Sequence, residues 1–156
     1  MERTIIKLVD KHYESDNDMK NLLKYIAGKG KNNCTEKLLC QCGRGVSKKF
    51  EEAAEQMIIV QKAYGKAKKR RMYQLIVSLP KYIHNKNVAM TIATEISDIL
   101  YMDYQVFYGI HISKENWHIH YAINAVNYRT GNKWHQSKKE FDKMKREIAN
   151  VVERHT

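Results

Sequence analysis

The sequence predicts an α+β fold in which helices pack on one face of an antiparallel sheet. Segments rich in β-branched and aromatic residues alternate with segments whose apolar residues recur every three or four positions. Two of the strand-like segments are separated only by the polar stretch SKEN, which favours an antiparallel hairpin. The length of 156 residues suits one domain, and we expect residues 1–156 to form it.

In the first half of the chain, β-branched residues predict a strand at 3–9. A helix is expected at 16–28, where four apolar residues fall on one stripe and a glycine ends the pattern. Residues 29–46 show no clear period, and we expect a loop with a short strand near 38–41. A serine that can act as a cap then precedes a second helix at 48–64.

The second half is expected to contain a strand at 72–79, a helix at 87–100, strands at 104–112 and 117–127, and a helix that begins at Ser137. The chain's one proline closes the first of these strands. The middle helix follows from a stripe of valine, isoleucine and leucine. A capping-box pattern, serine followed three residues later by glutamate, marks the start of the last helix.

The charge of the chain indicates a polyanionic partner. It has 28 Lys and Arg against 17 Asp and Glu, which gives a formal net charge of +11. Nucleic acid is the commonest polyanion, because each neutralised phosphate releases counterions, although an acidic membrane or solubility alone would also explain the surplus. Long apolar runs and a signal peptide are both absent, so we expect a cytoplasmic protein without membrane insertion.

The cysteines do not form a recognisable framework. Cys34, Cys40 and Cys42 make an odd count and include no CxxC pair. We therefore expect reduced thiols, as in a cytosol. The alternative is a metal site that combines cysteines with a distant histidine.

Three of the seven histidines gather in the expected hairpin. Side chains alternate along a strand, so His118 and His120 share a face that we expect to be open, while Tyr121 faces the helices. His111 ends the preceding strand and can present a third imidazole beside them. Three nitrogen ligands on rigid strands, with positions left for water or substrate, suit a catalytic divalent metal ion. The alternative is a surface coincidence, or imidazoles hydrogen-bonded to their neighbours.

The residues around this hairpin resemble those of a known family. The stretch QVFYGIHISKENWHIHYAINAVNYRTGNKWHQSKKEFDK is similar to the histidine motif of conjugative relaxases of the mobilisation-protein type, in particular the MOBP class of the HUH endonuclease superfamily. The likeness comprises the first histidine, the HxH pair, Asn124, Asn127 and the Thr130-Gly131 turn. Upstream, KNLLKYIAGKGK is similar to the family's nucleophile motif, and FEEAAEQM and YQLIVSLP to the helix and strand between them.

The resemblance implies a fold and a reaction. The family's fold is a five-stranded antiparallel sheet with flanking helices. The implied reaction is site- and strand-specific nicking of single-stranded origin-of-transfer DNA through a 5′-phosphotyrosyl adduct, for the conjugative mobilisation of a plasmid or integrative element. Carried over, Tyr25 is the nucleophile, and His111, His118 and His120 bind a divalent cation. We expect Mn²⁺ or Mg²⁺, with Zn²⁺, Ni²⁺ and Co²⁺ as alternatives.

Basic residues are expected to serve the nucleophile and the DNA. The metal ion and Lys24 or Lys29 could lower the pKa of the Tyr25 phenol, which is about 10 when unperturbed. The dense run GKAKKRR either contacts the DNA backbone or is a solvated linker. The expected DNA contacts are Lys68, Lys69, Arg70 and Arg71 of this run, together with Lys24 and Lys29. The resemblance also implies accessory relaxosome proteins and a coupling protein as partners.

The sequence leaves several alternatives open. Many relatives have an acidic residue two positions after the first histidine, where this chain has Ser113, so either that acid is dispensable or another group orients His111. His12 is an alternative nucleophile. Rolling-circle replication initiators and transposases of the HUH class share the chemistry, but their tyrosine usually follows the histidines, whereas Tyr25 precedes them. Outside enzymes, the alternative is a non-catalytic nucleic-acid-binding protein.

Overall fold

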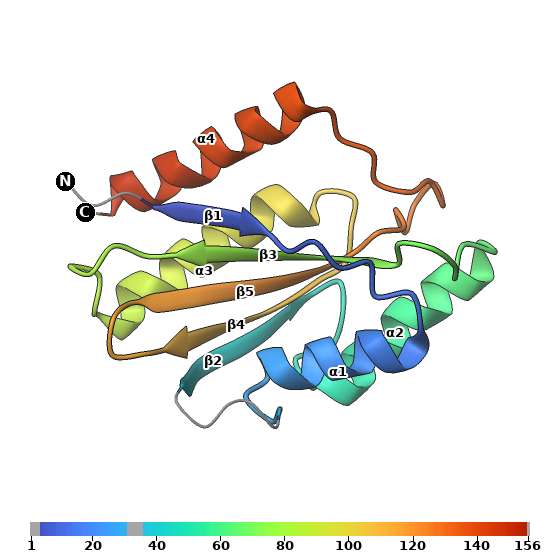
Figure 1. Cartoon of the computed structure of the whole chain (residues 1–156), viewed down its shortest axis with the longest axis horizontal. Coiled ribbons are helices and arrows are strands. Elements are labelled where there is room, and N and C mark those ends of the chain that lie inside the picture. The colour runs from blue at the N-terminus through green and yellow to red at the C-terminus, as the bar shows by residue number, and fades with distance from the viewer. Residues whose placement is uncertain (1–3, 31–35, 156) are drawn as a thin grey trace.

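Five antiparallel strands form one sheet with helices on both sides of it (Figure 1). The computed structural model describes residues 4–30 and 36–155. In chain order the elements are β1 (Ile5–Leu8), α1 (Asp16–Ile26), β2 (Lys37–Arg44), α2 (Phe50–Ala63), β3 (Met72–Ser78), α3 (Lys86–Tyr101), β4 (Val106–Ile112), β5 (Trp117–Asn124) and α4 (Lys138–Arg154). The strand order in the sheet is β1-β3-β5-β4-β2. Within the described ranges, none of the helices is long and apolar enough to cross a membrane.

The expected α+β class and the five-stranded antiparallel sheet are confirmed, and most elements end within three residues of their expected ends. β2 differs, because it is a full edge strand and not a short one near 38–41. It pairs with β4 along its length, with one register shift between Leu38 and Cys40. Cys40 and Cys42 are half-buried free thiols of this strand, and Cys34 lies outside the described residues.

The central hairpin has the register that the histidine pattern requires. β4 pairs with β5 so that His111 lies opposite His118, and His120 follows on the same side of β5. The predicted alternation along β5 is confirmed by the packing on the two faces. Ala122 belongs to the apolar cluster under α1 and α2, whereas Tyr121 belongs to the cluster on the opposite face.

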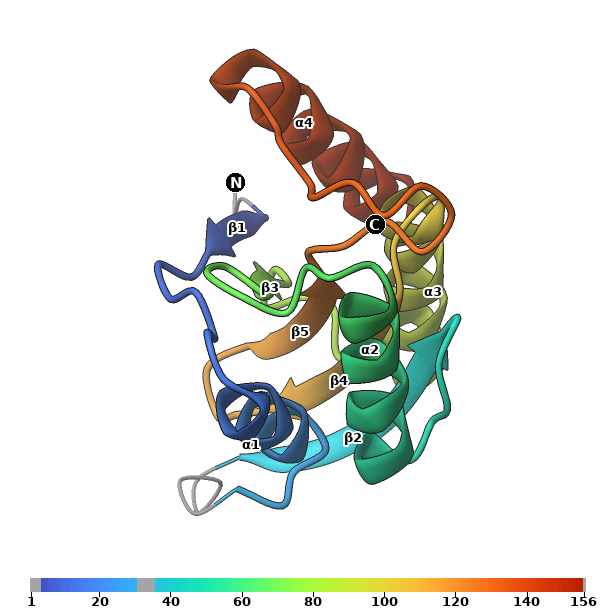
Figure 2. The ribbon, with the colours of Figure 1, turned by 90° about the vertical axis from the view of Figure 1, so that its right-hand side faces the viewer.

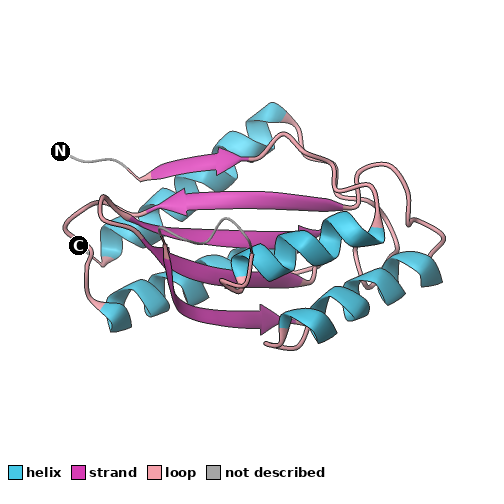
Figure 3. Ribbon diagram, turned by 60° about the horizontal axis from the view of Figure 1, so that its bottom comes forward, coloured by secondary structure: helices cyan, strands magenta, loops and turns pink. Residues whose placement is uncertain are grey.

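Helices cover both faces of the sheet, as Figure 2 shows. α1 and α2 lie over one face and pack on Met72, Phe107 and Ala122, while α3 and α4 pack on the other. The expectation of helices on one face, with the histidine face open, is therefore wrong. The reason is visible in β4, where every residue from Val106 to His111 is buried, so that neither side of the strand faces solvent. Figure 3 shows this layered arrangement from a third direction.

A buried polar network joins α1 and α2 to the sheet. The Gln61 side-chain amide donates to the Arg71 carbonyl at 2.7 Å and to Asn124 Oδ1 at 2.9 Å. The Arg71 guanidinium in turn donates to Gln61 Oε1 at 2.8 Å and to Asp16 Oδ1 at 2.6 Å. Because Arg71 is only 3% exposed, its charge depends on this carboxylate at the start of α1. The network therefore fixes the N-terminal end of α1.

Replacing Asp16 with Asn should destabilise the fold at neutral pH, because the buried guanidinium of Arg71 loses its carboxylate. The Asp16 side chain is 40% exposed, so we expect a loss of about 2 kcal/mol, between the values for exposed and buried pairs. Hydrogen bonds from Arg71 and then Lys62 lower the pKa of Asp16 below its ordinary value of 3.8. Its stabilisation is thus present above that value and is lost as pH falls through the lowered pKa.

Urea unfolding between neutral and strongly acidic pH measures both effects. The difference between wild type and Asp16→Asn should close in acid. The matched control is Asp142→Asn, which removes an exposed ion pair with Lys145 and should change the free energy of unfolding by less than about 0.5 kcal/mol. Equal losses in the two variants at neutral pH would contradict a special role for Asp16.

Candidate metal and nucleophile site

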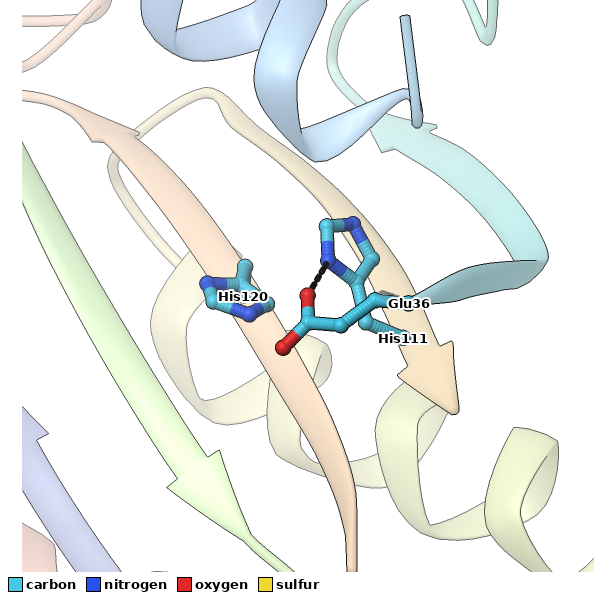
Figure 4. Close-up of side chains that lie close together, drawn as sticks. All are labelled: Glu36, His111 and His120. Carbon is cyan, nitrogen blue, oxygen red and sulfur yellow. Dashed lines mark hydrogen bonds and ion pairs between the residues drawn. The ribbon is translucent and has the colours of Figure 1, made fainter. Parts of the chain in front are cut away.

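Two histidines and a glutamate meet on the face of the sheet that α1 covers. The rings of His111 in β4 and His120 in β5 lie 4.5 Å apart between centroids. Glu36, which immediately precedes β2, points toward them (Figure 4). One ligand atom of each of the three lies within 4.8 Å of the other two. Imidazole nitrogens and a carboxylate oxygen together are a donor set for divalent cations.

His111 is held between two acceptors and is 1% exposed. Its Nε2 donates to the carbonyl oxygen of Ile26 at 2.8 Å, which ties the ring to the last residue of α1. Its Nδ1 lies 2.9 Å from Glu36 Oε2. An ionised carboxylate can only accept, so a hydrogen or a cation must lie between Nδ1 and Glu36.

His120 has one satisfied nitrogen and one that is not. Nδ1 lies 3.1 Å from Gln74 Oε1, whereas Nε2 is buried without a hydrogen-bond partner among the described residues. Burial, and then the neighbouring His111 and His118, lower the pKa of His120 to about 3, so the ring is neutral at physiological pH. Buried polar atoms rarely stay unpartnered, and a metal ligand must be deprotonated. These residues therefore fit a divalent cation.

His118 stands beside this group. Its ring centroid lies 6.4 Å from that of His120, and its Nδ1 is also buried without a partner in the described part of the chain. The structure thus places all three expected histidines on one side of the sheet. Within residues 4–30 and 36–155, however, the compact set of donors is Glu36 with His111 and His120, and His118 is not part of it.

α1 presents Tyr25 to the two imidazoles. Ser15 caps the helix through its side chain, and Tyr25 lies in the last turn. The Tyr25 ring makes edge contacts with His111 and with His120, at 5.3 Å between centroids in both cases. The structure therefore brings the expected nucleophile to the expected cation site.

The surroundings of Tyr25 keep its phenol protonated. Burial, and then the negative charge of Glu36, raise the pKa of Tyr25 above its ordinary value of 10.0. Lys24 and Lys29 are exposed and are not among the groups that shift this pKa. The expectation that they lower it is wrong for the protein without DNA. The phenol is consequently neutral at physiological pH.

A glycine allows α1 to approach β4 closely enough for these contacts. A Cβ on Gly109 would lie 2.5 Å from the Ile26 carbonyl oxygen and 3.2 Å from the Ile26 side chain. Real Cβ atoms essentially never come within 3.0 Å of such a group. Gly109 is therefore required for space, and it sets the distance between the helix that carries Tyr25 and the strand that carries His111.

The basic run after α2 divides into exposed and engaged residues. Lys68 and Lys69 are exposed, whereas the half-buried Arg70 donates to two carbonyls of the segment after β1. Arg71 is buried in the network described above, so the expectation that it contacts DNA is corrected. Arg71, the last residue of the run, contacts Asp16 at the start of α1, about 14 Å along the helix from Tyr25 at 1.5 Å per residue.

The motif asparagines hold the turn behind β5 and not the cation site. Asn124 is fully buried and bonds to α2 through Gln61. Asn127 Oδ1 accepts from the backbone N–H groups of the next turn, at 2.8 and 3.1 Å. Gly131 in that turn has φ +75°, and a Cβ there would collide with the ring of Tyr64. These residues act on the site only by fixing the end of the strand that carries the HxH pair.

Sequence reasoning missed Glu36 and Gln74. Ser113 does not replace the missing acid, because its hydroxyl donates to the Asn116 carbonyl within the hairpin turn. The acid that contacts His111 is Glu36, 75 residues earlier. No motif in the sequence around Glu36 indicates this contact. Gln74 looks like an ordinary polar residue of a strand. Only the pairing of β3 with β5 places it diagonally beside His120.

Known proteins resemble the chain in sequence and in fold. A family model described as relaxase, MobA/VirD2-like, nuclease domain, matches residues 25–156. Two Staphylococcus aureus proteins named protein rlx are 33% and 38% identical over 61 and 55 residues, which is 39% and 35% of this chain but 19% and 17% of theirs. A solved structure described as the molecular basis of vancomycin resistance transfer in Staphylococcus aureus has a TM-score of 0.68 at 13% identity, over 99% of this chain and 92% of that one.

Replacing Gly109 with Ala should push the last turn of α1 off β4 and break the hydrogen bond between His111 and Ile26. We expect a loss of about 1–3 kcal/mol in the free energy of unfolding, the usual cost of overpacking, together with shifts in the NMR signals of the Tyr25 and His111 rings. The control is Gly65→Ala, where a Cβ meets nothing within 4 Å and only the positive φ opposes it. Unchanged ring signals in Gly109→Ala would show that α1 does not depend on this close approach.

Proposed function

This chain belongs to the relaxase family of MobA/VirD2-like nuclease domains, and we propose that it nicks one strand of origin-of-transfer DNA by transesterification through Tyr25. The observation that carries the proposal is the contact of the Tyr25 ring with the imidazoles of His111 and His120. A nucleophile held against a cation site is positioned to attack a phosphate bound there. Residues 1–156 would act as one nuclease domain.

In the proposed step, Tyr25 Oη attacks the phosphorus of one phosphodiester of single-stranded DNA. A P–Oη bond forms and the bond from phosphorus to the 3′ oxygen breaks. The phenol gives up its proton, and the departing 3′ oxygen gains one. The product is a 5′-phosphotyrosyl adduct and a free 3′-hydroxyl, which can reseal the strand by the reverse reaction without ATP.

The free protein would hold this nucleophile in its unreactive form. The raised pKa leaves the Tyr25 hydroxyl protonated, and its half-burial between α1 and the sheet limits contact with solvent. Deprotonation of Oη therefore belongs to the state in which DNA is bound.

The proposed ligands of the divalent cation are His111, His120 and Glu36, with His118 beside them. When bound, the cation would neutralise charge on the scissile phosphate and fix it for in-line attack. The Ile26 carbonyl orients the ring of His111 by accepting from Nε2, so that Nδ1 faces the cation site. Of the two ions expected, the mixture of nitrogen and oxygen donors favours Mn²⁺ over Mg²⁺.

The DNA would follow the exposed basic residues along α1. Lys24 and Lys29 lie at the Tyr25 end of the helix. Lys68 and Lys69 shortly precede Arg71, which contacts Asp16 at the start of the helix. Phosphate contacts of this kind add affinity without sequence preference. Accessory relaxosome proteins and a coupling protein are proposed partners of the cytoplasmic bacterial complex.

Replacing Tyr25 with Phe should abolish the covalent adduct, because no oxygen remains to attack the phosphorus. The wild-type chain is incubated with labelled single-stranded origin oligonucleotides and Mn²⁺ or Mg²⁺, and the adduct is resolved on a denaturing gel. We expect at least about a 1,000-fold loss in Tyr25→Phe, with binding of the oligonucleotide retained.

Tyr82→Phe is the matched control, because Tyr82 is an exposed phenol. It should form the adduct at the wild-type rate. Unchanged adduct formation in Tyr25→Phe would exclude Tyr25 as the nucleophile. Absence of any adduct in wild type under all metal conditions would support a non-catalytic nucleic-acid-binding protein.

Replacing Glu36 with Gln should weaken cation binding by about 10-fold or more, because the site loses its anionic donor. Mn²⁺ binding is measured by calorimetry or EPR on the chain without DNA. His118→Ala should have a smaller effect, since His118 lies outside the compact set. Glu115→Gln, in the exposed hairpin turn, should have none. Loss of binding in His118→Ala with normal binding in Glu36→Gln would favour the three-histidine site over this one.

A further inference from the structure

A hydrogen-bonded chain leads from the cation site into the segment before α1. His120 Nδ1 lies 3.1 Å from Gln74 Oε1, and the Gln74 amide nitrogen donates to the Tyr13 hydroxyl at 2.7 Å. All three side chains are buried: His120 is 4% exposed, Gln74 7% and Tyr13 4%. Buried side chains cannot exchange these hydrogen bonds for bonds to water. The direction of each hydrogen bond therefore matters for the site.

The direction of these bonds determines where His120 carries its hydrogen. The carbonyl oxygen of an amide can only accept, so Nδ1 must be the nitrogen that donates to Gln74. The hydrogen of a neutral imidazole then sits on Nδ1, and Nε2 keeps its lone pair. Nε2 is the atom of His120 that is buried and has no partner among the described residues. Gln74 therefore leaves free the nitrogen that the cation site needs.

Tyr13 anchors the far end of the Gln74 amide. If the amide turned over, its nitrogen would face Nδ1, and the hydrogen of a neutral His120 would have to move to Nε2. The Tyr13 hydroxyl supports the observed position by accepting from the amide nitrogen at 2.7 Å. Tyr13 has φ 55°, a left-handed conformation that is strained for a bulky residue. The fold maintains this strain at the residue that anchors Gln74.

The strained segment is anchored to the start of β3. The Arg71 backbone N–H donates to the His12 carbonyl at 2.9 Å, and the Arg70 guanidinium donates to the carbonyls of Val9 and Lys11 at 3.3 Å. These bonds hold the backbone immediately before Tyr13. Arg70, which the sequence predicted to contact DNA, thus supports the segment that carries the Tyr13 hydroxyl.

The two cation-facing histidines use opposite nitrogens. His111 gives its Nε2 hydrogen to the Ile26 carbonyl and turns Nδ1 toward Glu36. His120 gives its Nδ1 hydrogen to Gln74, and its Nε2 keeps a lone pair that meets no partner in the described part of the chain. Each ring therefore needs its own acceptor, and an exchange of tautomer in either one would place a hydrogen where a cation should be.

We propose that Gln74, held in place by Tyr13, is a positioning residue that fixes His120 with its hydrogen on Nδ1 and so directs Nε2 toward the cation. The inference rests on the cation site of the proposed function. Gln74 touches neither DNA nor the reacting atoms in this proposal; it acts through His120.

The test reads the tautomer directly, by ¹⁵N NMR of histidine-labelled chain without metal at neutral pH. In wild type, His120 should show the signature of a hydrogen on Nδ1. Gln74→Met keeps the length of the side chain but removes the acceptor, so this preference should disappear and Mn²⁺ affinity should fall about 10–100-fold. Gln74→Glu keeps an acceptor for Nδ1 and lets the Tyr13 hydroxyl donate to its other oxygen, so it should restore the tautomer and most of the affinity.

A matched pair of tyrosine variants separates positioning from stability. Tyr13→Phe and Tyr121→Phe each delete a buried hydroxyl, which bonds to Gln74 in the first case and to the Ala93 carbonyl on the opposite face in the second. Both should lose a similar free energy of unfolding, because each loses one buried hydrogen bond. Only Tyr13→Phe should change the tautomer of His120 and weaken Mn²⁺ binding, and it serves as the test if Gln74→Met does not fold.

Two results would overturn the proposal. One is a wild-type tautomer of His120 in both Gln74→Met and Tyr13→Phe, or in whichever of the two folds. The other is equal changes in tautomer and Mn²⁺ affinity in Tyr13→Phe and Tyr121→Phe, which would assign them to general destabilisation. Neither measurement uses DNA. If the tautomer and the Mn²⁺ affinity change as expected but the chain forms no adduct with DNA, that result would contradict the proposed nicking function and not this positioning role.

Discussion

The close contact between the last turn of α1 and β4 is the constraint on which the site depends. The Ile26 carbonyl, left without an intrahelical partner at the helix end, accepts from His111 Nε2 at 2.8 Å. The absence of a side chain at Gly109 makes room for this carbonyl. One interaction thus places Tyr25 over the imidazoles, orients His111 and closes this face of the sheet. The other end of α1 is fixed separately, through Asp16 and the buried Arg71.

Burial gives these polar groups their chemical character. Among the described residues, a buried His120 Nε2 without a partner is a costly arrangement, and so is a partly buried carboxylate that faces His111. A divalent cation would offset that cost, since it supplies the positive charge that the donors lack. The cover by α1 also half-buries Tyr25, and this burial raises the pKa of its phenol. The geometry and the protonation states of these groups therefore have one origin in the covering of the histidine face by α1.

The sequence predicted the parts of this site that follow from local periodicity. Alternation along β5 correctly placed His118 and His120 on one face, and the short turn correctly brought His111 opposite them. The helical end of the KYIAGKGK stretch likewise placed Tyr25 in the last turn of α1. In each case the residues concerned are close in sequence, or belong to one hairpin, so backbone geometry alone relates them.

The sequence did not predict contacts that depend on tertiary pairing. Glu36 reaches His111 from a segment without a period, and Gln74 reaches His120 only because β3 is the neighbour of β5. Arg71 looked like part of a solvated basic run, yet its burial is decided by Asp16 and Gln61, 55 and 10 residues away. The sequence did not predict that helices cover both faces of the sheet. A strand that is buried on both sides has an unbroken apolar run, and such a run does not show which faces are covered.

Paramagnetic NMR with Mn²⁺ tests the central claim most directly, that one cation site lies between the imidazoles and the Tyr25 phenol. Mn²⁺ is added in substoichiometric amounts to chain labelled at histidine and tyrosine, and the broadening of each ring signal is followed. The signals of His111, His120 and Tyr25 should broaden first and together. Broadening that begins at His84 or His135, both exposed, with the Tyr25 signal unaffected, would contradict the claim.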